Sequence, residues 1–151
     1  MSPIVLLLGI FFVVSPMESS SQEPPSWSGE ELLFETFSIA GVDPSTGESG
    51  VAVTTRRPCV GNGVPWVKAG VGAVATQAST RVAYGEELLA MIEDGLDPAN
   101  ALNIALAEDT LAHRRQVALI RIDGRSAQHT GSSTNPWTGH RSGPDYVTQG
   151  N

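Results

Sequence analysis

The stretch from Gly70 to Gln77, GVGAVATQ, constrains the fold most, because its side chains are so small. A strand with this little bulk suits a position packed closely on both faces. Two further apolar strands precede it, TFSI from Thr36 and GVAVTT from Gly50. Hydroxyl, amide and cationic side chains lie at the ends of these three strands. A rigid sheet can hold a reactive site at such a place.

Turn residues separate the first two of these strands. Residues Asp43–Glu48 read DPSTGE and are typical of the connection in an antiparallel hairpin. Residues 58–69 then hold two prolines, glycines and Trp66. We expect this segment to form a loop that arches over the sheet before the third strand and lines a pocket.

Two helices are predicted after the third strand. Apolar residues at helical spacing indicate a first helix from about Val82 to Asp94, with Gly95 suited to the left-handed position after its end. Asp97 and Pro98 start the second helix, since aspartate caps free amides and proline lacks one. The two helices should form a hairpin that covers one face of a sheet.

The last third of the chain predicts three more strands. Residues 116–122 form an apolar strand, and the Asp123-Gly124 turn returns it along residues 126–130. A crossing rich in Gly, Ser and Pro over residues 131–144 leads to a short strand at 145–149. The order of three strands, two helices and three strands predicts an α+β fold with largely antiparallel sheets.

The N-terminal residues differ in composition from the rest. Residues 1–21 resemble a signal peptide, with an apolar run from Ile4 to Val14 that is shorter than the about 20 residues of a membrane span. Residues 22–34 are expected to be a flexible linker before a domain at 35–151. We therefore expect a secreted or periplasmic protein without a stable membrane span. An uncleaved anchor, or a downstream start that leaves the protein cytoplasmic, is the alternative.

Charge and side-chain chemistry argue against nucleic-acid binding and against a metal or cofactor site. A formal net charge of −7 argues against binding to nucleic acid, which requires clustered Lys and Arg. The three histidines show no helical HxxxH spacing and there is no second cysteine, so neither zinc nor another cofactor is expected. His129 and Thr130 are expected to line a substrate pocket. The lone Cys59 is either a nucleophilic thiol or, as we favour, an incidental cysteine.

Several short phrases occur in one order through residues 36–151, and together they carry a resemblance. The sequence resembles a bacterial and archaeal family of uncharacterised domains (DUF1028) that is assigned to the N-terminal nucleophile hydrolase superfamily. The phrases are TFSI, DPSTGESGVAV, VPW, AGVGAVATQ, YG, RQVALI, HTG, GH and QGN.

The resemblance implies a four-layer αββα sandwich and an amide hydrolase. In such enzymes an N-terminal residue attacks the amide while its own free amine takes the proton. The resemblance indicates Thr36 as this nucleophile, although threonine is also simply a good strand former. Lys68 is the expected neighbouring cation and Arg56 is its rival, and either is otherwise a solvated surface charge. Thr55 and Gln77 are expected to orient the amine or the substrate.

Two features depart from the family pattern. Residues 1–35 precede Thr36, so its amine must be freed by self-cleavage, by another protease or by use of a downstream start. The chain stops at Asn151 where relatives continue, so we expect a truncated domain whose open sheet edges favour a homo-oligomer.

Two function classes follow from the sequence. The first is a hydrolase that cleaves an amide bond in a small acylated or peptide-like substrate. The second is a secreted, non-catalytic binding domain associated with the cell wall, because some relatives carry a peptidoglycan-binding module.

Overall fold

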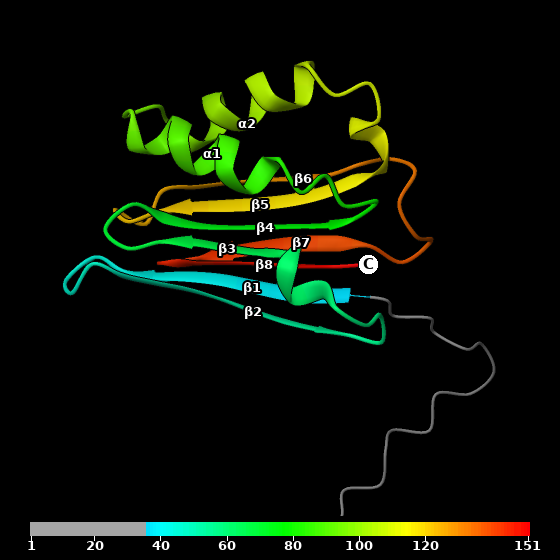
Figure 1. The fold of residues 1–151 in the computed structure, drawn as a ribbon, viewed down its shortest axis with the longest axis horizontal. Helices are drawn as coiled ribbons and strands as arrows, with labels where there is room; N and C mark the ends of the chain where they lie inside the picture. Colours follow the sequence, from blue (N-terminus) through cyan, green and yellow to red (C-terminus); the bar gives the residue numbers. More distant parts are fainter. Residues whose placement is uncertain (1–35) are drawn as a thin grey trace, which may run out of the picture. The chain divides into compact units, whose positions relative to one another are not determined.

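Eight strands and two α-helices make up residues 36–151, the part of the chain that the computed structural model describes (Figure 1). The expected signal segment 1–21 and linker 22–34 lie outside the described residues. The strands are β1 Thr36–Asp43, β2 Glu48–Thr55, β3 Pro65–Lys68, β4 Gly72–Ala78, β5 Arg115–Arg121, β6 Ser126–Thr130, β7 Gly139–Gly143 and β8 Tyr146–Gly150. The helices are α1 Tyr84–Glu93 and α2 Pro98–Ala107, with short 3₁₀ helices η1 Val60–Asn62 and η2 Ala112–Arg114.

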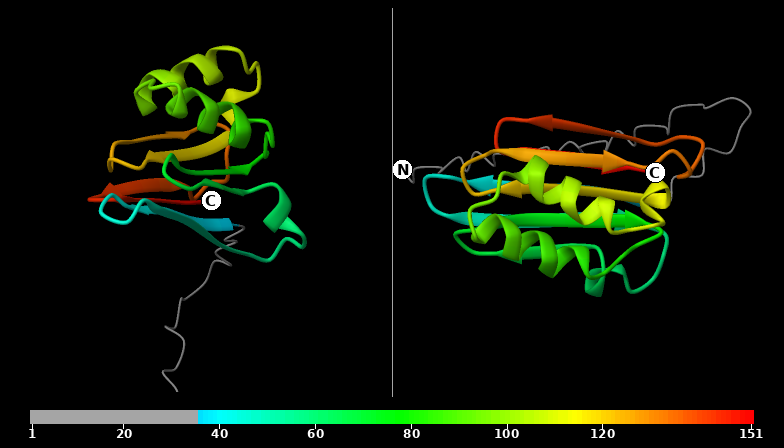
Figure 2. Two further views of the ribbon diagram at one scale, coloured as in Figure 1. Left: turned by 60° about the vertical axis from the view of Figure 1, so that its left-hand side comes forward. Right: turned by 90° about the horizontal axis from the view of Figure 1, so that it is seen from above.

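The strands form two four-stranded antiparallel sheets that stack on each other. The first sheet has the order β2-β1-β8-β7 and the second has the order β3-β4-β5-β6. Helices α1 and α2 lie side by side on the outer face of the second sheet (Figure 2). The mixed α+β prediction with antiparallel sheets is confirmed. Of the four layers that the resemblance implies, the described residues form three.

The first hairpin and the helix signals are confirmed. Strands β1 and β2 pair with Asp43 opposite Glu48, and Asp43 Oδ1 accepts hydrogen bonds from the amide of Ser45 (2.8 Å) and its hydroxyl (2.6 Å). These bonds, the side-chain one foremost, lower the pKa of the Asp43 carboxyl. Asp97 caps α2 by accepting the Ala99 amide at 2.9 Å, and Gly95 takes a left-handed φ of 96° after α1.

Two strands lie where the sequence predicts irregular structure, so those predictions are wrong. Strand β3 falls inside the expected loop 58–69, and β7 falls inside the expected crossing 131–144. Both are edge strands, where one side of the backbone needs no partner strand. An edge position tolerates Pro65 at the start of β3 and the glycine-rich, polar sequence GHRSG in β7. Their composition therefore resembles that of loops.

The core has two parts of different size. Large side chains fill the space between the helices and the second sheet: Tyr84, Leu88, Leu89, Ile92, Leu102, Val117 and Leu119. A smaller cluster of Ala40, Ala73, Ala118, Ile120 and Val147 separates the two sheets. The small residues of β4 thus lie at the centre of the stack, and β4 is buried on both faces, as its composition predicts. Polar side chains occupy one end of the space between the sheets.

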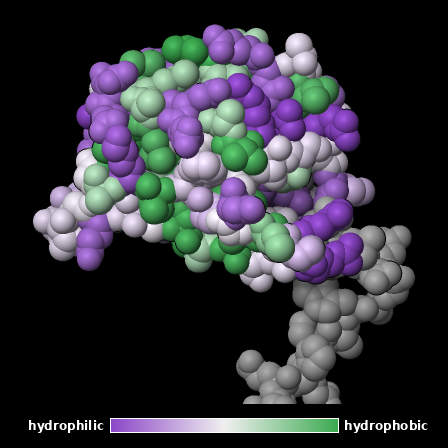
Figure 3. All heavy atoms as spheres, in the orientation of Figure 1, coloured by the Kyte–Doolittle hydropathy of each residue, from purple (hydrophilic) through white to green (hydrophobic). Residues whose placement is uncertain are grey.

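The outer face of the first sheet carries exposed apolar side chains. Phe37, Ile39 and Tyr146 alternate with buried neighbours and are 47%, 39% and 41% exposed. Along the side of the molecule seen in Figure 3, hydrophobic residues are likewise exposed among hydrophilic ones. No helix of residues 36–151 has the length and hydrophobicity that crossing a bilayer requires.

Candidate functional site

Thr36 begins a central strand of the first sheet and faces the second sheet. It is 9% exposed, and its Oγ1 lies 3.2 Å from Oγ1 of Thr55, its partner on β2. On the other side its amide donates to the carbonyl of Asn151 at 3.2 Å, and the Asn151 amide returns a bond to the Thr36 carbonyl at 2.9 Å. The start of β1 and the end of the chain therefore meet at one end of the stack (Figure 1).

A pocket of about 320 Å³ opens beside Thr36. It lies between the first strand of one sheet and the end of β4 in the other. Polar side chains form one wall, and short aliphatic side chains from the η1 region and the end of β4 form the rest. The lining residues are Thr36, Arg57, Val60, Val64, Gln77, Ala78, Thr80 and Asn151. The pocket brings together two hydroxyls, two carboxamides and a guanidinium, and no Asp or Glu side chain is in its lining.

A buried chain of amide side chains supports this pocket. Ser38 Oγ donates to Gln77 Oε1 at 2.7 Å, and Gln77 Nε2 donates to Gln116 Oε1 at 2.7 Å. Asn151 Nδ2 donates to the same Gln116 oxygen at 3.1 Å. All four side chains are at most 2% exposed. Because buried amides are costly unless paired, this network fixes the relative position of the two sheets at the pocket.

Gln77 also links the network to the backbone of Thr36. Its Nε2 lies 3.4 Å from the Thr36 carbonyl and 3.5 Å from the Gln149 carbonyl. Gln149 itself donates to the Ala75 carbonyl at 2.9 Å, while its buried Oε1 has no hydrogen-bond partner among the described residues. An orphaned amide oxygen inside the stack is the kind of cost that functional regions retain.

Unusual backbone conformations flank the pocket. Ala78, which lines it, has a φ of 67°, and Cys59, next to the lining residue Val60, has a φ of 60°. Left-handed backbone is unfavourable for residues with a Cβ and persists only where the surroundings enforce it. Strain of this kind is common at functional sites.

An ion pair between Asp109, which follows α2, and Arg115, the first residue of β5, contacts the segment after Ala78. Arg115 Nε donates to Asp109 Oδ2 at 2.9 Å, and a guanidinium nitrogen of Arg115 also donates to the Ser79 carbonyl. Tyr84 Oη donates to the same carboxylate at 2.8 Å. The hydrogen bond from Arg115 is the main reason that the pKa of Asp109 falls to about 2, while burial raises the pKa of Tyr84 to about 12. The Arg115–Asp109 ion pair therefore holds Ser79, which follows the lining residue Ala78, at one rim of the pocket.

Among the residues predicted for the site, Thr55 and Gln77 lie beside Thr36, but the two proposed cations do not line the pocket. Lys68 pairs in register with Gly72, five residues from Gln77 along β4, which corresponds to about 17 Å. Its ammonium forms a half-exposed ion pair with Glu93 of α1. Arg56 follows β2 directly and is exposed, next to Arg57, which does line the pocket.

His129 and Thr130 lie on opposite faces of the second sheet. Thr130 faces the first sheet, where its Oγ1 lies 3.1 Å from Gln116 Nε2 and 2.8 Å from His140 Nδ1. Thr130 therefore belongs to the buried amide network, although it does not line the pocket. His129 points toward the helical side, and its Nε2 lies 2.9 Å from the carbonyl of Ala112 in η2. The structure does not bring His129 to Thr36.

Sequence reasoning missed Arg57, Gln116 and Asn151. Gln116 and Asn151 reach Thr36 only through strand pairing across most of the chain, which a local pattern does not reveal. The phrases RQVALI and QGN contain both residues and are the only local signal for them. Arg57 adjoins Arg56, and only Arg57 lines the pocket. A 3.1 Å hydrogen bond from the Arg57 amide to Thr55 Oγ1 fixes the turn that places it there.

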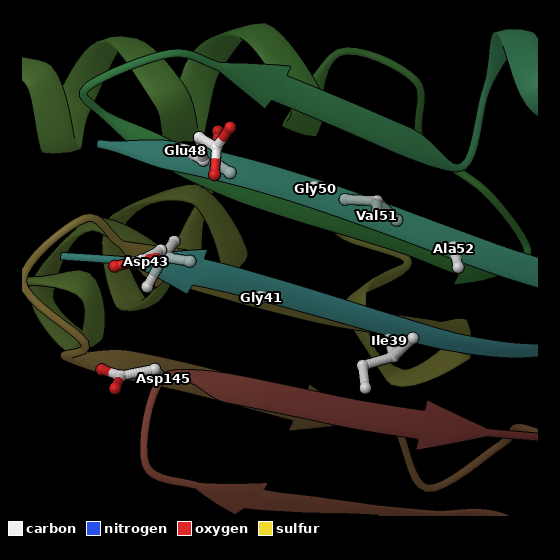
Figure 4. A pocket seen from close by; sticks show the side chains of 10 residues that line it. Ile39, Gly41, Asp43, Glu48, Gly50, Val51, Ala52 and Asp145 are labelled. Atoms are coloured by element: carbon white, nitrogen blue, oxygen red, sulfur yellow. The ribbon is translucent and has the colours of Figure 1, made fainter. Parts of the chain in front are cut away.

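A larger hollow of about 530 Å³ lies on the outer face of the first sheet (Figure 4). The paired glycines Gly41 and Gly50 leave its floor without side chains. Carboxylates at its turn end include Asp43 and Glu48, which accept hydrogen bonds from the turn between them. The hollow has no hydroxyl and amide constellation like that at Thr36. Within residues 36–151, no group of three or more His, Cys, Asp and Glu side chains is arranged to hold a metal ion.

A family model and a solved structure indicate one family. A comparison with curated proteins finds no match. The crystal structure of protein SPO2555 from Silicibacter pomeroyi, described as a DUF1028 protein, superposes with a TM-score of 0.73 at 34% sequence identity. The match covers 77% of this chain and 52% of that one, so this chain spans about half the length of that relative. The model of the family of unknown function DUF1028 matches residues 36–151. The chain belongs to the DUF1028 family.

Proposed function

We propose that this protein is an amidohydrolase of the N-terminal nucleophile type, in which Thr36 attacks an amide bond of a small acylated or peptide-like substrate. The proposal includes the finer fold assignment, an αββα sandwich of that superfamily. One observation carries it: a nearly buried threonine begins a central strand and lies beside a polar pocket between two sheets. Once residues 1–35 are removed, the nitrogen of this threonine is a free amine.

The chemistry needs no other base. The Thr36 amine, with an ordinary pKa near 8, takes the proton of Oγ1 as that oxygen bonds to the substrate carbonyl carbon. The same proton passes to the leaving nitrogen as the C–N bond breaks, which leaves an ester on Thr36. Water then hydrolyses the ester to a carboxylate and restores the hydroxyl.

The surroundings of Thr36 support its hydroxyl as the nucleophile and its amine as the base. The hydroxyl is held 3.2 Å from Thr55 Oγ1, and the nitrogen lies 3.2 Å from the Asn151 carbonyl, which can orient the ammonium or amine. Gln77, itself fixed by Ser38 and Gln116, reaches the Thr36 carbonyl. Buried hydrogen bonds of this kind hold a nucleophile near one geometry, which is what pre-organised catalysis requires.

The first test is the N-terminus of the protein purified from its native host, measured by intact mass. A mature chain that begins at Thr36 is the expected result. A chain that retains residues 33–35 in its mature form contradicts the hydrolase and favours the secreted binding domain, with the cell wall as its candidate partner.

The second test is chemical and uses a chain that begins at residue 36. A β-lactone, which acylates nucleophilic hydroxyls, should label Thr36, and the site is located by peptide mass spectrometry. Thr36→Ser should keep labelling and amine release from a panel of N-acyl amino acids. Thr36→Val, which keeps the shape and removes the hydroxyl, should abolish both. Equal turnover by Thr36→Val and the unmodified chain would refute the assignment.

A further inference from the structure

We infer that Asn151 is a catalytic residue whose side-chain amide donates a hydrogen bond to the oxygen of the substrate carbonyl while Thr36 Oγ1 is bonded to the carbonyl carbon. This inference rests on the proposed function of Thr36. When Oγ1 attacks, the π electron pair of the carbonyl moves onto its oxygen, which becomes an anion, and the pair returns when the C–N bond breaks. A donor fixed in advance at this oxygen is a large contribution to catalysis in acyl transfer.

Strand pairing places Asn151 directly beside Thr36. The amide of each residue donates to the carbonyl of the other, which continues the register that sets Phe37 opposite Gly150. Opposite residues of an antiparallel pair carry their side chains on the same face, with Cβ atoms about 5 Å apart. Both side chains line the pocket, and the Asn151 amide reaches Gln116 of the second sheet. A carbon bonded to Thr36 Oγ1, with a donor about 3 Å from its oxygen, fits this separation.

The orientation of the Asn151 carboxamide is fixed by Gln116. Gln116 Nε2 donates to the main-chain carbonyls of Gly139 at 3.1 Å and Gly150 at 2.9 Å, and carbonyls only accept. Gln116 Oε1 therefore lies on the other side and accepts a hydrogen, so Asn151 presents its nitrogen there, at 3.1 Å. Asn151 Oδ1 lies 3.5 Å from Nδ2 of Asn135. The Asn151 side chain, 2% exposed, is thus held in one orientation before any ligand binds.

A count of hydrogens separates the two carboxamides of the lining. An amide nitrogen carries two hydrogens. Gln77 Nε2 has three acceptors, which use both of them: Gln116 Oε1 at 2.7 Å and the carbonyls of Thr36 at 3.4 Å and Gln149 at 3.5 Å. Asn151 Nδ2 has one acceptor among the described residues, Gln116 Oε1. Its second hydrogen is nearly buried without an acceptor, which is costly, and an oxygen of a ligand in the pocket would satisfy it.

Thr80 supplies a rival donor in the lining. It follows β4 and is exposed, and within residues 36–151 no hydrogen bond holds its hydroxyl. A hydrated hydroxyl must reorient as charge develops on the substrate, whereas an amide that is already held needs no rearrangement. Asn151 is therefore the better-placed donor.

The test uses the mature protein that begins at Thr36. It measures the rate at which the β-lactone acylates Thr36, and kcat and KM for the N-acyl amino acid that is turned over fastest. Asn151→Leu, similar in size but without a donor, should lower the acylation rate and kcat by about 100-fold or more. KM should change far less, because the hydrogen bond strengthens mainly in the transition state.

Asn151→Asp is the second variant and serves if Asn151→Leu does not fold, as judged by circular dichroism. Its protonated form can still donate to Gln116 but has no second hydrogen for the substrate. It should show the same loss. Asn135→Leu is the matched control, because it makes the same substitution at the other neighbour of the Asn151 carboxamide, outside the pocket lining. Its acylation rate and kcat should stay close to those of the unmodified protein.

Two results would overturn the inference and leave the hydrolase standing. The first is acylation of Thr36 at an unchanged rate in a folded Asn151 variant, and the second is a raised KM with an unchanged kcat, which indicates ordinary binding. A loss in Thr80→Val without one in the Asn151 variants would assign the role to Thr80 instead. Absence of acylation at Thr36 in the unmodified protein would contradict the proposed function itself, and this inference with it.

Discussion

Replacing Asp109 by asparagine tests the ion pair that anchors the pocket rim. The carboxylate accepts hydrogen bonds from Arg115 and Tyr84, and its side chain and that of Arg115 are 6% and 12% exposed. The pKa of Asp109 lies near 2, below its ordinary value of 3.8. At about 1.4 kcal/mol per pKa unit, the folded protein stabilises the ionised carboxylate by about 2 kcal/mol. In other proteins, removal of one partner of a buried ion pair lowers the free energy of unfolding by about 3–5 kcal/mol.

We therefore expect Asp109→Asn to lower the free energy of unfolding by about 2–4 kcal/mol at pH 7. Because the pKa is lower in the folded state than in the unfolded state, this stabilisation is complete above about pH 5 and is lost as the pH falls through 2. The difference between the two proteins should thus be constant from about pH 5 to 8 and shrink in acid.

Urea unfolding followed by circular dichroism, at a series of pH values, measures this difference. Asp123→Asn is the matched control, since Asp123 also pairs with an arginine but both side chains are solvent-exposed, at 39% and 53%. Its cost should stay below about 1 kcal/mol. A difference for Asp109→Asn that is as small as the control, or that persists unchanged at pH 2.5, would refute the argument.

Three further expectations concern the helices. Gly85→Ala should lower stability by about 1–3 kcal/mol in urea unfolding, because an added Cβ would lie 2.0 Å from the Trp66 ring. Asp97→Ala removes the cap of α2 and should cost about 1 kcal/mol, measured by the thermal midpoint. Absorbance titration of the unmodified protein against Tyr84→Phe should give a Tyr84 pKa near 12, whereas a midpoint near 10 would show that the burial and Asp109 contact are lost in solution. Since this pKa is raised on folding, the associated stabilisation is present below about pH 10 and declines as the pH rises through 12.

The sequence predicts the elements whose signals are local. Asp97-Pro98 marks the start of α2, and the turn chemistry of Asp43–Glu48 marks the first hairpin, because each depends on hydrogen bonds within a few residues. Strands β3 and β7 were not predicted. Their residues satisfy few rules of a strand on their own, and only the neighbouring strand makes them extended.

The candidate site is predicted only in part, because strand pairing decides which of the predicted residues meet. Thr36, Thr55 and Gln77 stand at strand ends, and the structure brings them together. Lys68 is close to β4 in the chain, but β3 runs antiparallel to β4, which carries Lys68 to the end opposite Gln77. The alternation of strand faces likewise sends His129 toward the helices. Direction and pairing of strands, rather than residue type, separate the right assignments from the others.

The mutual hydrogen bonds of Thr36 and Asn151 join the first and last described residues at the centre of one sheet. Strand β1 cannot gain its inner neighbour β8 until residues 146–150 have been synthesised. During translation the helices and strands β4 and β5 have their partners first, whereas the first sheet is incomplete until β8 has been synthesised. Such a high contact order slows folding. Among the described residues, the surroundings of Thr36 are therefore completed last.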